Sequence, residues 1–412
     1  GDFRVPAVAA VHADGSSALD LRYYSHTVKP GKYGIEGLPA VYAAEDEAET
    51  LEVVLRDTAS AVEVTLLYAV LPALDLVTRC ARIRNLGETP VTLTKAASLC
   101  LDISRGSWEW VHFHGRHAME RQMERRLLFH GIQEIGSTRG TSSHHQNPTV
   151  LLCTPDCTET AGACIGAALV YSGSHQTRLE CDQLGQVRMV MGIHPDLFRW
   201  ELKAGETFST PEVMLSYSDT GLETLSHHFH QAIREHICRG KYQLAERPVL
   251  INNWEATYFG FDTEKILHIA EEAARLGVDM LVLDDGWFGK RDDDCSGLGD
   301  WFVNETKLSG GLHDLVEKIK GMGMRFGIWF EPEMISEDSD LYRKHPDWAI
   351  RIPDRAPMRS RYQLVLDMAN PEVQEYLFRV MSDVLHSADI SYVKWDMNRS
   401  ISDWYTRTLP AD

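Results

Sequence analysis

Long apolar runs are missing from this sequence of 412 residues. None approaches the roughly 18 consecutive apolar residues that a membrane-spanning helix requires. The first residues, Gly1-Asp-Phe-Arg-Val-Pro, contain neither a basic cluster nor a following apolar segment, so they do not resemble a signal peptide. We therefore expect a cytoplasmic protein that does not act at a membrane.

An excess of positive charge is missing as well. The sequence has 41 Lys and Arg residues against 60 Asp and Glu residues, which gives a formal net charge of -19. A chain of this charge repels the phosphates of nucleic acids and anionic lipids. We expect no nucleic-acid partner.

Cysteine is too sparse for a scaffold held together by disulfides, because only eight residues are spread over the whole chain. Reduced thiols are the simpler interpretation. Three of the cysteines lie close together, but their spacing is not that of a paired zinc motif, and we predict no metal site there. These three are Cys153, Cys157 and Cys164.

The composition is that of a folded protein with a substantial core, since 44% of the residues are hydrophobic and 25% are charged. The length suits two or three domains. Up to about residue 218, short alternating runs separated by turn residues predict an all-β sandwich. Apolar residues spaced by three or four predict a helix over 220–238, which we interpret as the bridge to the next domain.

After residue 247 the pattern changes to strands alternating with helices, which predicts a parallel sheet. We place one domain at 1–240 and the other at 241–412. The predicted strands begin at Val249, Met280, Phe326 and Ser391, and polar or acidic residues follow each of them. Both a (β/α)8 barrel and a doubly wound sheet place their sites at these strand ends. A whole barrel needs about 250 residues, so only about its first four units would be present.

The sharpest motif is Lys394-Trp-Asp-Met-Asn-Arg, at the end of the last predicted strand. Because side chains alternate between the faces of a strand, Lys394, Asp396 and Asn398 share one face. An ammonium group beside a carboxylate favours the ionised form of the acid, which suits an anionic nucleophile. The pattern equally fits a buried ion pair that only stabilises the sheet, and spacing does not decide between the two.

Two further strand ends carry acids. Asp284 and Asp285 follow an apolar strand, where carboxylates are costly unless they meet partners such as sugar hydroxyls. The alternative is that they cap the following turn. The segment Trp329-Phe-Glu-Pro-Glu-Met suits stacking on a sugar ring together with acceptance of its hydroxyls, or else core packing with a supporting acid.

Together these motifs resemble glycoside hydrolase family 36, and specifically its bacterial α-galactosidases. The resemblance rests on the order and spacing of six motifs, and it extends into the first half through Asp20-Leu-Arg-Tyr-Tyr-Ser-His and Glu36-Gly-Leu-Pro-Ala. The six are Asn252-Asn-Trp-Glu-Ala-Thr-Tyr-Phe, Leu283-Asp-Asp-Gly-Trp-Phe-Gly-Lys-Arg, Gly299-Asp-Trp, Phe326-Gly-Ile-Trp-Phe-Glu-Pro-Glu-Met, His345-Pro-Asp-Trp and Lys394-Trp-Asp-Met-Asn-Arg.

The resemblance implies a β-sandwich domain followed by a (β/α)8 barrel. It also implies a retaining α-galactosidase that hydrolyses terminal α-D-galactosyl residues of melibiose- and raffinose-type oligosaccharides, with no cofactor and no metal. Asp396 would be the nucleophile of the double displacement. Arg361 rests on a weaker local match than the other sugar-binding residues. Those expected to contact galactose are Trp254, Asp284, Asp285, Trp329, Arg361, Lys394 and Asn398.

A retaining mechanism also needs an acid/base carboxyl, and the resemblance places this Asp in a later loop. We therefore expect a chain truncated at both ends that lacks the acid/base residue. The resemblance further implies a homo-oligomer, commonly a tetramer assembled through the sandwich domain. Two alternatives stay open: a non-catalytic galactoside-binding remnant, and a galactosyl transferase or α-N-acetylgalactosaminidase of the same family. His112, His114 and His117 have a spacing that could ligate a metal, although the resemblance implies none.

Overall fold

The computed structural model describes residues 5–196 and 198–409, so the outermost residues of both predicted domains lie outside it. The chain forms two compact units that divide between residues 245 and 246. The domain boundary expected after residue 240 falls in the connection between the last helix of the first unit and the first strand of the second. Each unit has its own core.

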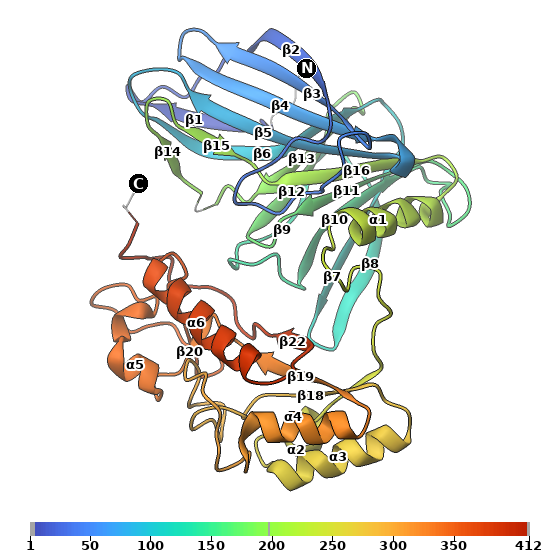
Figure 1. Cartoon of the computed structure of the whole chain (residues 1–412). Coiled ribbons are helices and arrows are strands. Elements are labelled where there is room, and N and C mark those ends of the chain that lie inside the picture. The colour runs from blue at the N-terminus through green and yellow to red at the C-terminus, as the bar shows by residue number, and fades with distance from the viewer. Residues whose placement is uncertain (1–4, 197, 410–412) are drawn as a thin grey trace. The chain divides into compact units, whose positions relative to one another are not determined.

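The first unit contains two antiparallel sheets that pack face to face, as the alternating sequence pattern predicts (Figure 1). Their inner faces share a core that includes Leu99, Val150, Leu179 and Met189. Among the described residues the smaller sheet has six strands in the order β1-β6-β13-β12-β9, with β14 also pairing with β6. These strands are β1 (Val8–His12), β6 (Val91–Ile103), β9 (Gly131–Ser137), β12 (His175–Cys181), β13 (Val187–Ile193) and β14 (Trp200–Leu202).

The larger sheet has ten strands within the described residues, in the order β2-β3-β4-β5-β16-β11-β10-β7-β8, with β15 also pairing with β5. The predicted helix is confirmed as α1 (Leu222–His236), which follows β16 and packs on this sheet. The strands are β2 (Arg22–Pro30), β3 (Glu49–Asp57), β4 (Val62–Leu71), β5 (Leu76–Asn85), β7 (Glu109–Arg116), β8 (Met119–Leu127), β10 (Gln146–Cys153), β11 (Cys164–Val170), β15 (Thr207–Ser209) and β16 (Glu212–Ser218).

The second unit is built on a parallel sheet of four strands in the order β17-β18-β19-β22. The four predicted strands are confirmed as β17 (Leu250–Asn252), β18 (Met280–Leu283), β19 (Arg325–Phe330) and β22 (Tyr392–Trp395). All of β18 and most of β19 are buried, as expected of parallel strands covered by helices. The sequence did not predict a small separate sheet between β19 and β22, in which β20 (Met334–Ile335) pairs antiparallel with β21 (Leu364–Val365).

Capping residues mark the ends of helices in the second unit. In α3 (Thr263–Arg275), the side chain of Asp262 accepts a hydrogen bond from the backbone N–H of Lys265, and Gly277 beyond the helix has a φ of 81°. In α6 (Pro371–Ser387), Asn370 caps the first turn. The other helices of this unit are α2 (Trp254–Thr257), α4 (Gly311–Gly321) and α5 (Asp340–Lys344).

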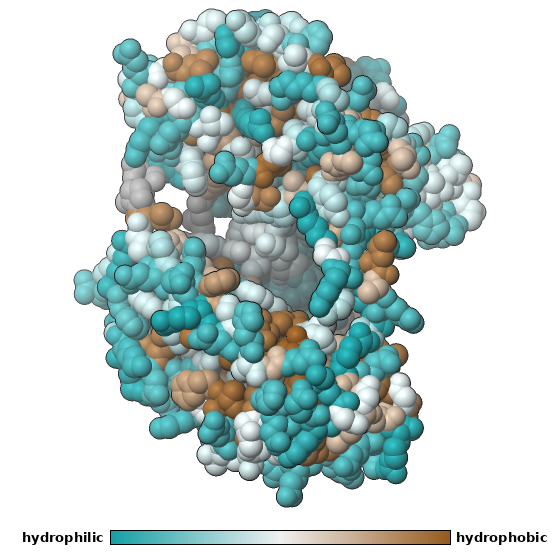
Figure 2. Space-filling model, viewed as in Figure 1, coloured by the Kyte–Doolittle hydropathy of each residue, from teal (hydrophilic) through white to brown (hydrophobic). Residues whose placement is uncertain are grey.

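The surface is polar, in keeping with the composition. Figure 2 shows that the visible face of each unit is mostly hydrophilic, with hydrophobic residues in small separate patches. Among the described residues, no helix combines the length and the apolar character needed to cross a membrane. All eight cysteines are free thiols.

A buried ion pair anchors the long connection between β2 and β3 to the larger sheet. The Nζ atom of Lys32 lies 2.5 Å from Oε1 of Glu212, and the two side chains are 2% and 0% exposed. Oε2 of Glu212 also accepts the backbone N–H of Val41 at 2.6 Å. Burial lowers the pKa of Lys32 and Glu212 opposes this effect, so the charge of Lys32 depends on its partner.

We expect Glu212→Gln to lower the free energy of unfolding by about 3–5 kcal/mol, because it leaves the ammonium group of Lys32 buried without a counter-charge. The matched control is Glu52→Gln, which removes an acid paired with the half-exposed Lys29. This control should cost less than about 1 kcal/mol. Urea unfolding of the three proteins measures the difference, and equal losses in the two variants would contradict the prediction.

Candidate functional site

Acids and amides gather at the carboxyl ends of the four parallel strands. Asn252 ends β17, Asp284 and Asp285 follow β18, Glu331 follows β19, and Asp396 follows β22. Because the strands are parallel and adjacent, these ends lie along one edge of the sheet (Figure 1). Ligand sites of α/β proteins occur at this edge.

Asp284 is the partner of Lys394. The Nζ atom of Lys394 lies 2.7 Å from Oδ2 of Asp284, and the same oxygen accepts the amide N–H of Asn252 at 2.5 Å. Among the described residues no hydrogen bond or ion pair joins Lys394 to Asp396, so the ammonium group pairs with an acid of another strand rather than with the acid of its own motif. β22 pairs with β19, and the long side chain of Lys394 reaches past β19 to the end of β18. A sequence spacing within one strand cannot reveal this contact.

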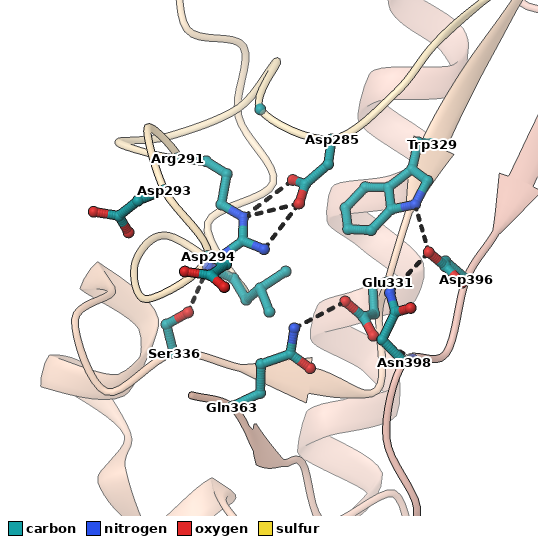
Figure 3. A network of polar contacts seen from close by, with 12 residues as sticks. Asp285, Arg291, Asp293, Asp294, Trp329, Glu331, Ser336, Gln363, Asp396 and Asn398 are labelled. Atoms are coloured by element: carbon teal, nitrogen blue, oxygen red, sulfur yellow. Dashed lines mark hydrogen bonds and ion pairs between the residues drawn. The ribbon is translucent and has the colours of Figure 1, made fainter. Parts of the chain in front are cut away.

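Asp285 is held by a buried arginine. Arg291 is 2% exposed and donates from Nε and Nη2 to both carboxylate oxygens of Asp285, at 2.8–3.2 Å (Figure 3). Burial raises the pKa of Asp285, while the guanidinium group of Arg291 opposes the shift. Gly286 follows with a φ of 100°, a conformation that favours glycine, and it turns the chain immediately after the acid.

Asp396 is surrounded by three donors. Its Oδ2 atom accepts the indole N–H of Trp329 at 3.0 Å and the side-chain amide of Asn398 at 2.8 Å (Figure 3). Its Oδ1 atom accepts the backbone N–H of Met397 at 3.0 Å. Together these three donors restrain the orientation of the carboxylate. The expectation that Asp396 and Asn398 come together is thus met by a direct hydrogen bond.

Glu331 is fully buried behind Asp396. Its Oε1 atom accepts the backbone N–H of Asn398 at 2.6 Å, and its Oε2 atom accepts the side-chain amide of Gln363 at 3.2 Å (Figure 3). Burial raises its pKa to about 7, and the nearby carboxylates of Asp396 and Asp285 act in the same direction. Glu331 therefore changes its charge close to neutrality.

Both tryptophans expected at the site pack against other aromatic side chains of the protein. Trp329 is 1% exposed and stacks on Phe288, with ring centroids 6.1 Å apart and an angle of 11° between the planes. Trp254 is half-buried, and its edge packs against Tyr258 and Phe259. Trp329 thus acts here as core packing and as a hydrogen-bond donor.

Arg361 lies apart from this hydrogen-bonded network. It is exposed in a turn in which both Arg361 and Tyr362 have left-handed backbone conformations, with φ values of 51° and 60°. The turn leads directly to Gln363, which belongs to the network through Glu331. The structure brings together Asp284 with Lys394, and Asp396 with Trp329 and Asn398, but not Arg361.

Sequence reasoning missed three residues of this network. Arg291 lies within a recognised motif, but nothing in its spacing shows that it folds back six residues onto Asp285. Asn252 also lies within a motif, but the motif does not show that its side-chain amide donates to Asp284. Gln363 lies in the same weak local match as Arg361, two residues further along the chain, and nothing in that match indicates a contact with Glu331. Among the described residues, no group of three or more His, Cys, Asp or Glu side chains is arranged to hold a metal ion.

The sequence matches two family models over nearly its whole length. Residues 1–203 match the glycosyl hydrolase family 36 N-terminal domain, and residues 207–412 match the melibiase family. The chain belongs to glycoside hydrolase family 36. The sequence comparison and the structure comparison both find proteins named alpha-galactosidases.

Among family 36 relatives, the chain is 52% identical to the bifunctional alpha-galactosidase/sucrose kinase AgaSK of Mediterraneibacter gnavus, over 100% of this chain and 44% of that protein. It is 46% identical to alpha-galactosidase AgaA of Geobacillus stearothermophilus, over 100% of this chain and 56% of that protein. The crystal structure of AgaA superposes on this chain with a TM-score of 0.98. The superposed region is 100% of this chain and 57% of the AgaA chain. The chain spans about half the length of the curated relatives that it matches.

The raised pKa of Glu331 predicts a pH-dependent stability. The folded-state value of about 7 lies above the ordinary value of 4.5, so folding favours the protonated form. The stabilisation is complete below about pH 4.5 and is lost as the pH rises through 7. Relative to Glu331→Gln, which cannot ionise, the wild type should lose about 3 kcal/mol between these limits. Urea unfolding at several pH values from 4.5 to 8 measures this, and parallel pH dependences of the two proteins would contradict it.

Proposed function

We propose that the protein containing this chain is a retaining α-galactosidase, which hydrolyses terminal α-D-galactosyl residues of melibiose- and raffinose-type oligosaccharides by double displacement. The observation that carries the proposal is the environment of Asp396. Its carboxylate accepts hydrogen bonds from Trp329 and Asn398 at the carboxyl end of β22, the strand whose Lys394 pairs with Asp284. A nucleophile that must be anionic and oriented needs such an environment.

The relatives support the substrate. Variants of AgaA have been crystallised in complex with stachyose and with raffinose, at 46% identity to this chain and a TM-score of 0.97. The curated relatives from Pediococcus pentosaceus and Lactobacillus acidophilus, both 45% identical to this chain, are also named alpha-galactosidases. We propose that this chain binds the same class of galactose-containing oligosaccharide.

In the first step, a carboxylate oxygen of Asp396 forms a bond to the anomeric carbon of galactose while the bond from that carbon to the leaving oxygen breaks. The product is a galactosyl ester of Asp396. In the second step, water gives a proton to the acid/base carboxyl, attacks the same carbon from the side opposite Asp396 and releases the Asp396 carboxylate, so the configuration is retained. The amide of Asn398 and the indole of Trp329 fix the plane of the carboxylate for this attack.

Galactose hydroxyls would be recognised by the polar groups at the neighbouring strand ends. Asp284 and Lys394 form one acceptor–donor pair, and Asp285, held by Arg291, provides a second acceptor. We propose Trp254 and Trp329 as aromatic contacts and Asn398 and Arg361 as further polar contacts of the sugar. Because Asp284 is tied to Lys394 and Asp285 to Arg291, neither is free to serve as the general acid.

The leaving oxygen requires a proton from a second carboxyl about 5–5.5 Å from the nucleophile. We assign this role to no residue of the 412 and propose that it is supplied from outside them. We also propose that the four parallel strands of the second unit are the first four units of a (β/α)8 barrel. The parallel order of these strands, the helices between them and the family membership support this barrel.

The decisive test is chemical rescue in the full-length protein. Asp396→Gly should lower the hydrolysis of an aryl α-galactoside by roughly 10³-fold or more, because the covalent intermediate cannot form. Added azide, entering the space of the lost carboxylate, should yield the β-galactosyl azide. Asp383→Asn, on the exposed side of α6, serves as the control and should hydrolyse the substrate at the wild-type rate. Recovery of the α-azide, or a wild type without activity, would contradict the proposal.

We further propose that the protein acts in the cytoplasm as a homotetramer. The eight free thiols suit a reducing compartment, and the family resemblance supports the assembly. Sedimentation velocity of the full-length protein should give a single species of about four times the monomer mass. A stable monomer would contradict the tetramer.

A further inference from the structure

We propose that Glu331 is a positioning residue that holds the Asn398 segment in place, so that the side chain of Asn398 orients the nucleophilic carboxylate of Asp396. The inference rests on the proposed function of Asp396. It concerns an acid that neither the sequence pattern nor the chemistry of double displacement requires.

Asn398 connects Glu331 to Asp396. The carboxylate of Glu331 accepts the backbone N–H of Asn398 at 2.6 Å, and the side-chain amide of the same Asn398 donates to Oδ2 of Asp396 at 2.8 Å (Figure 3). Asn398 lies beyond the end of β22, where no strand pairing fixes the backbone. The bond to Glu331 therefore replaces the restraint that the sheet no longer provides.

Glu331 is itself rigidly held. It follows directly after β19, it is 0% exposed, and its second oxygen accepts the amide of Gln363 at 3.2 Å. Gln363 is 1% exposed, and its backbone carbonyl accepts the guanidinium of Arg399. A displacement of Asn398 would therefore require several buried groups to move together.

The arrangement tolerates a change in the charge of Glu331. The side-chain oxygen of Gln363 is buried and has no hydrogen-bond partner in the structure. If Glu331 is protonated on Oε2, rotation of the Gln363 amide presents this oxygen to the new O–H group. The other oxygen of Glu331 accepts the N–H of Asn398 in both states, so the positioning contact persists through the ionisation.

The electrostatic surroundings argue against a role as a mere space-filler. The charged groups that face Glu331 are Asp396 after β22 and Asp285 after β18, both of which disfavour its ionised form, with Arg399 reaching only the far side of Gln363. An apolar side chain of similar size would fill this space without the cost of burying an acid. What an apolar side chain cannot do is accept the N–H of Asn398.

Glu333 provides a matched comparison. It lies two residues away, burial raises its pKa too, and both its oxygens accept the indole N–H of Trp395, at 3.0 and 3.1 Å. No hydrogen bond joins it to Asn398 or Asp396 among the described residues. A variant of Glu333 therefore alters a neighbouring acid without removing the hydrogen bond between Glu331 and Asn398.

The test compares Glu331→Gln, Glu331→Met and Glu333→Gln in the full-length protein, with an activated aryl α-galactoside as substrate. Glu331→Gln keeps an acceptor for Asn398, so its kcat/KM should stay within about threefold of the wild type. Glu331→Met keeps the volume but has no acceptor, and it should lose on the order of 10²-fold in kcat, the usual effect of a misplaced reacting group. Its KM should change less than threefold. Glu333→Gln should match the wild type.

A double-mutant cycle identifies the path of the effect. If Glu331 acts through Asn398, the combined Glu331→Met and Asn398→Ala variant should be no slower than Asn398→Ala alone, within about threefold. Multiplying effects would overturn the inference. So would a Glu331→Gln variant as slow as Glu331→Met, or a Glu331→Met variant as fast as the wild type.

The Glu331→Gln variant keeps the test decisive if Glu331→Met does not fold, because a loss above tenfold in the Gln variant would by itself overturn the positioning role. The wild-type rate separates the two proposals. An inactive wild type overturns the proposed function and this inference together, whereas an active wild type with unaffected Met variants overturns this inference alone.

Discussion

The constraint on which the second unit depends is the gathering of carboxylates at one edge of a parallel sheet. Carboxylates that are partly or fully removed from water repel one another and lose hydration, so each needs its own compensation. Asp284 has Lys394 and Asn252, and Asp285 has Arg291. Asp396 has neutral donors only, and Glu331 is compensated so incompletely that burial raises its pKa to about 7.

This distribution separates the acids by role. The two that are paired with cations are held in a fixed geometry by those partners, which suits the proposed recognition of sugar hydroxyls. The carboxylate with only neutral donors is held in orientation without being neutralised, which suits an atom that must attack a carbon of developing positive charge. The first unit has a comparable arrangement in the buried pair of Lys32 and Glu212, which holds a long connection on a sheet.

The sequence predicted the large features because they follow from periodicity. Alternating runs indicated the sandwich, and the four strands of the parallel sheet were found within one residue of their observed starts. β18 begins where expected, β19 begins one residue earlier, and β17 and β22 each begin one residue later. The motif residues were also correctly placed at strand ends. The small sheet of β20 and β21 was not predicted, since two-residue strands carry too little pattern to detect.

What the sequence by itself determined is which residues end the strands, because strand direction and the alternation of side chains are local properties of the chain. What only the tertiary structure decided is which of these residues meet. Lys394 pairs with an acid on a strand two positions away in the sheet, Arg291 folds back onto Asp285, and Gln363 reaches Glu331 from a segment with only a weak local match. These contacts depend on side-chain length and on the order of strands, and a linear spacing records neither.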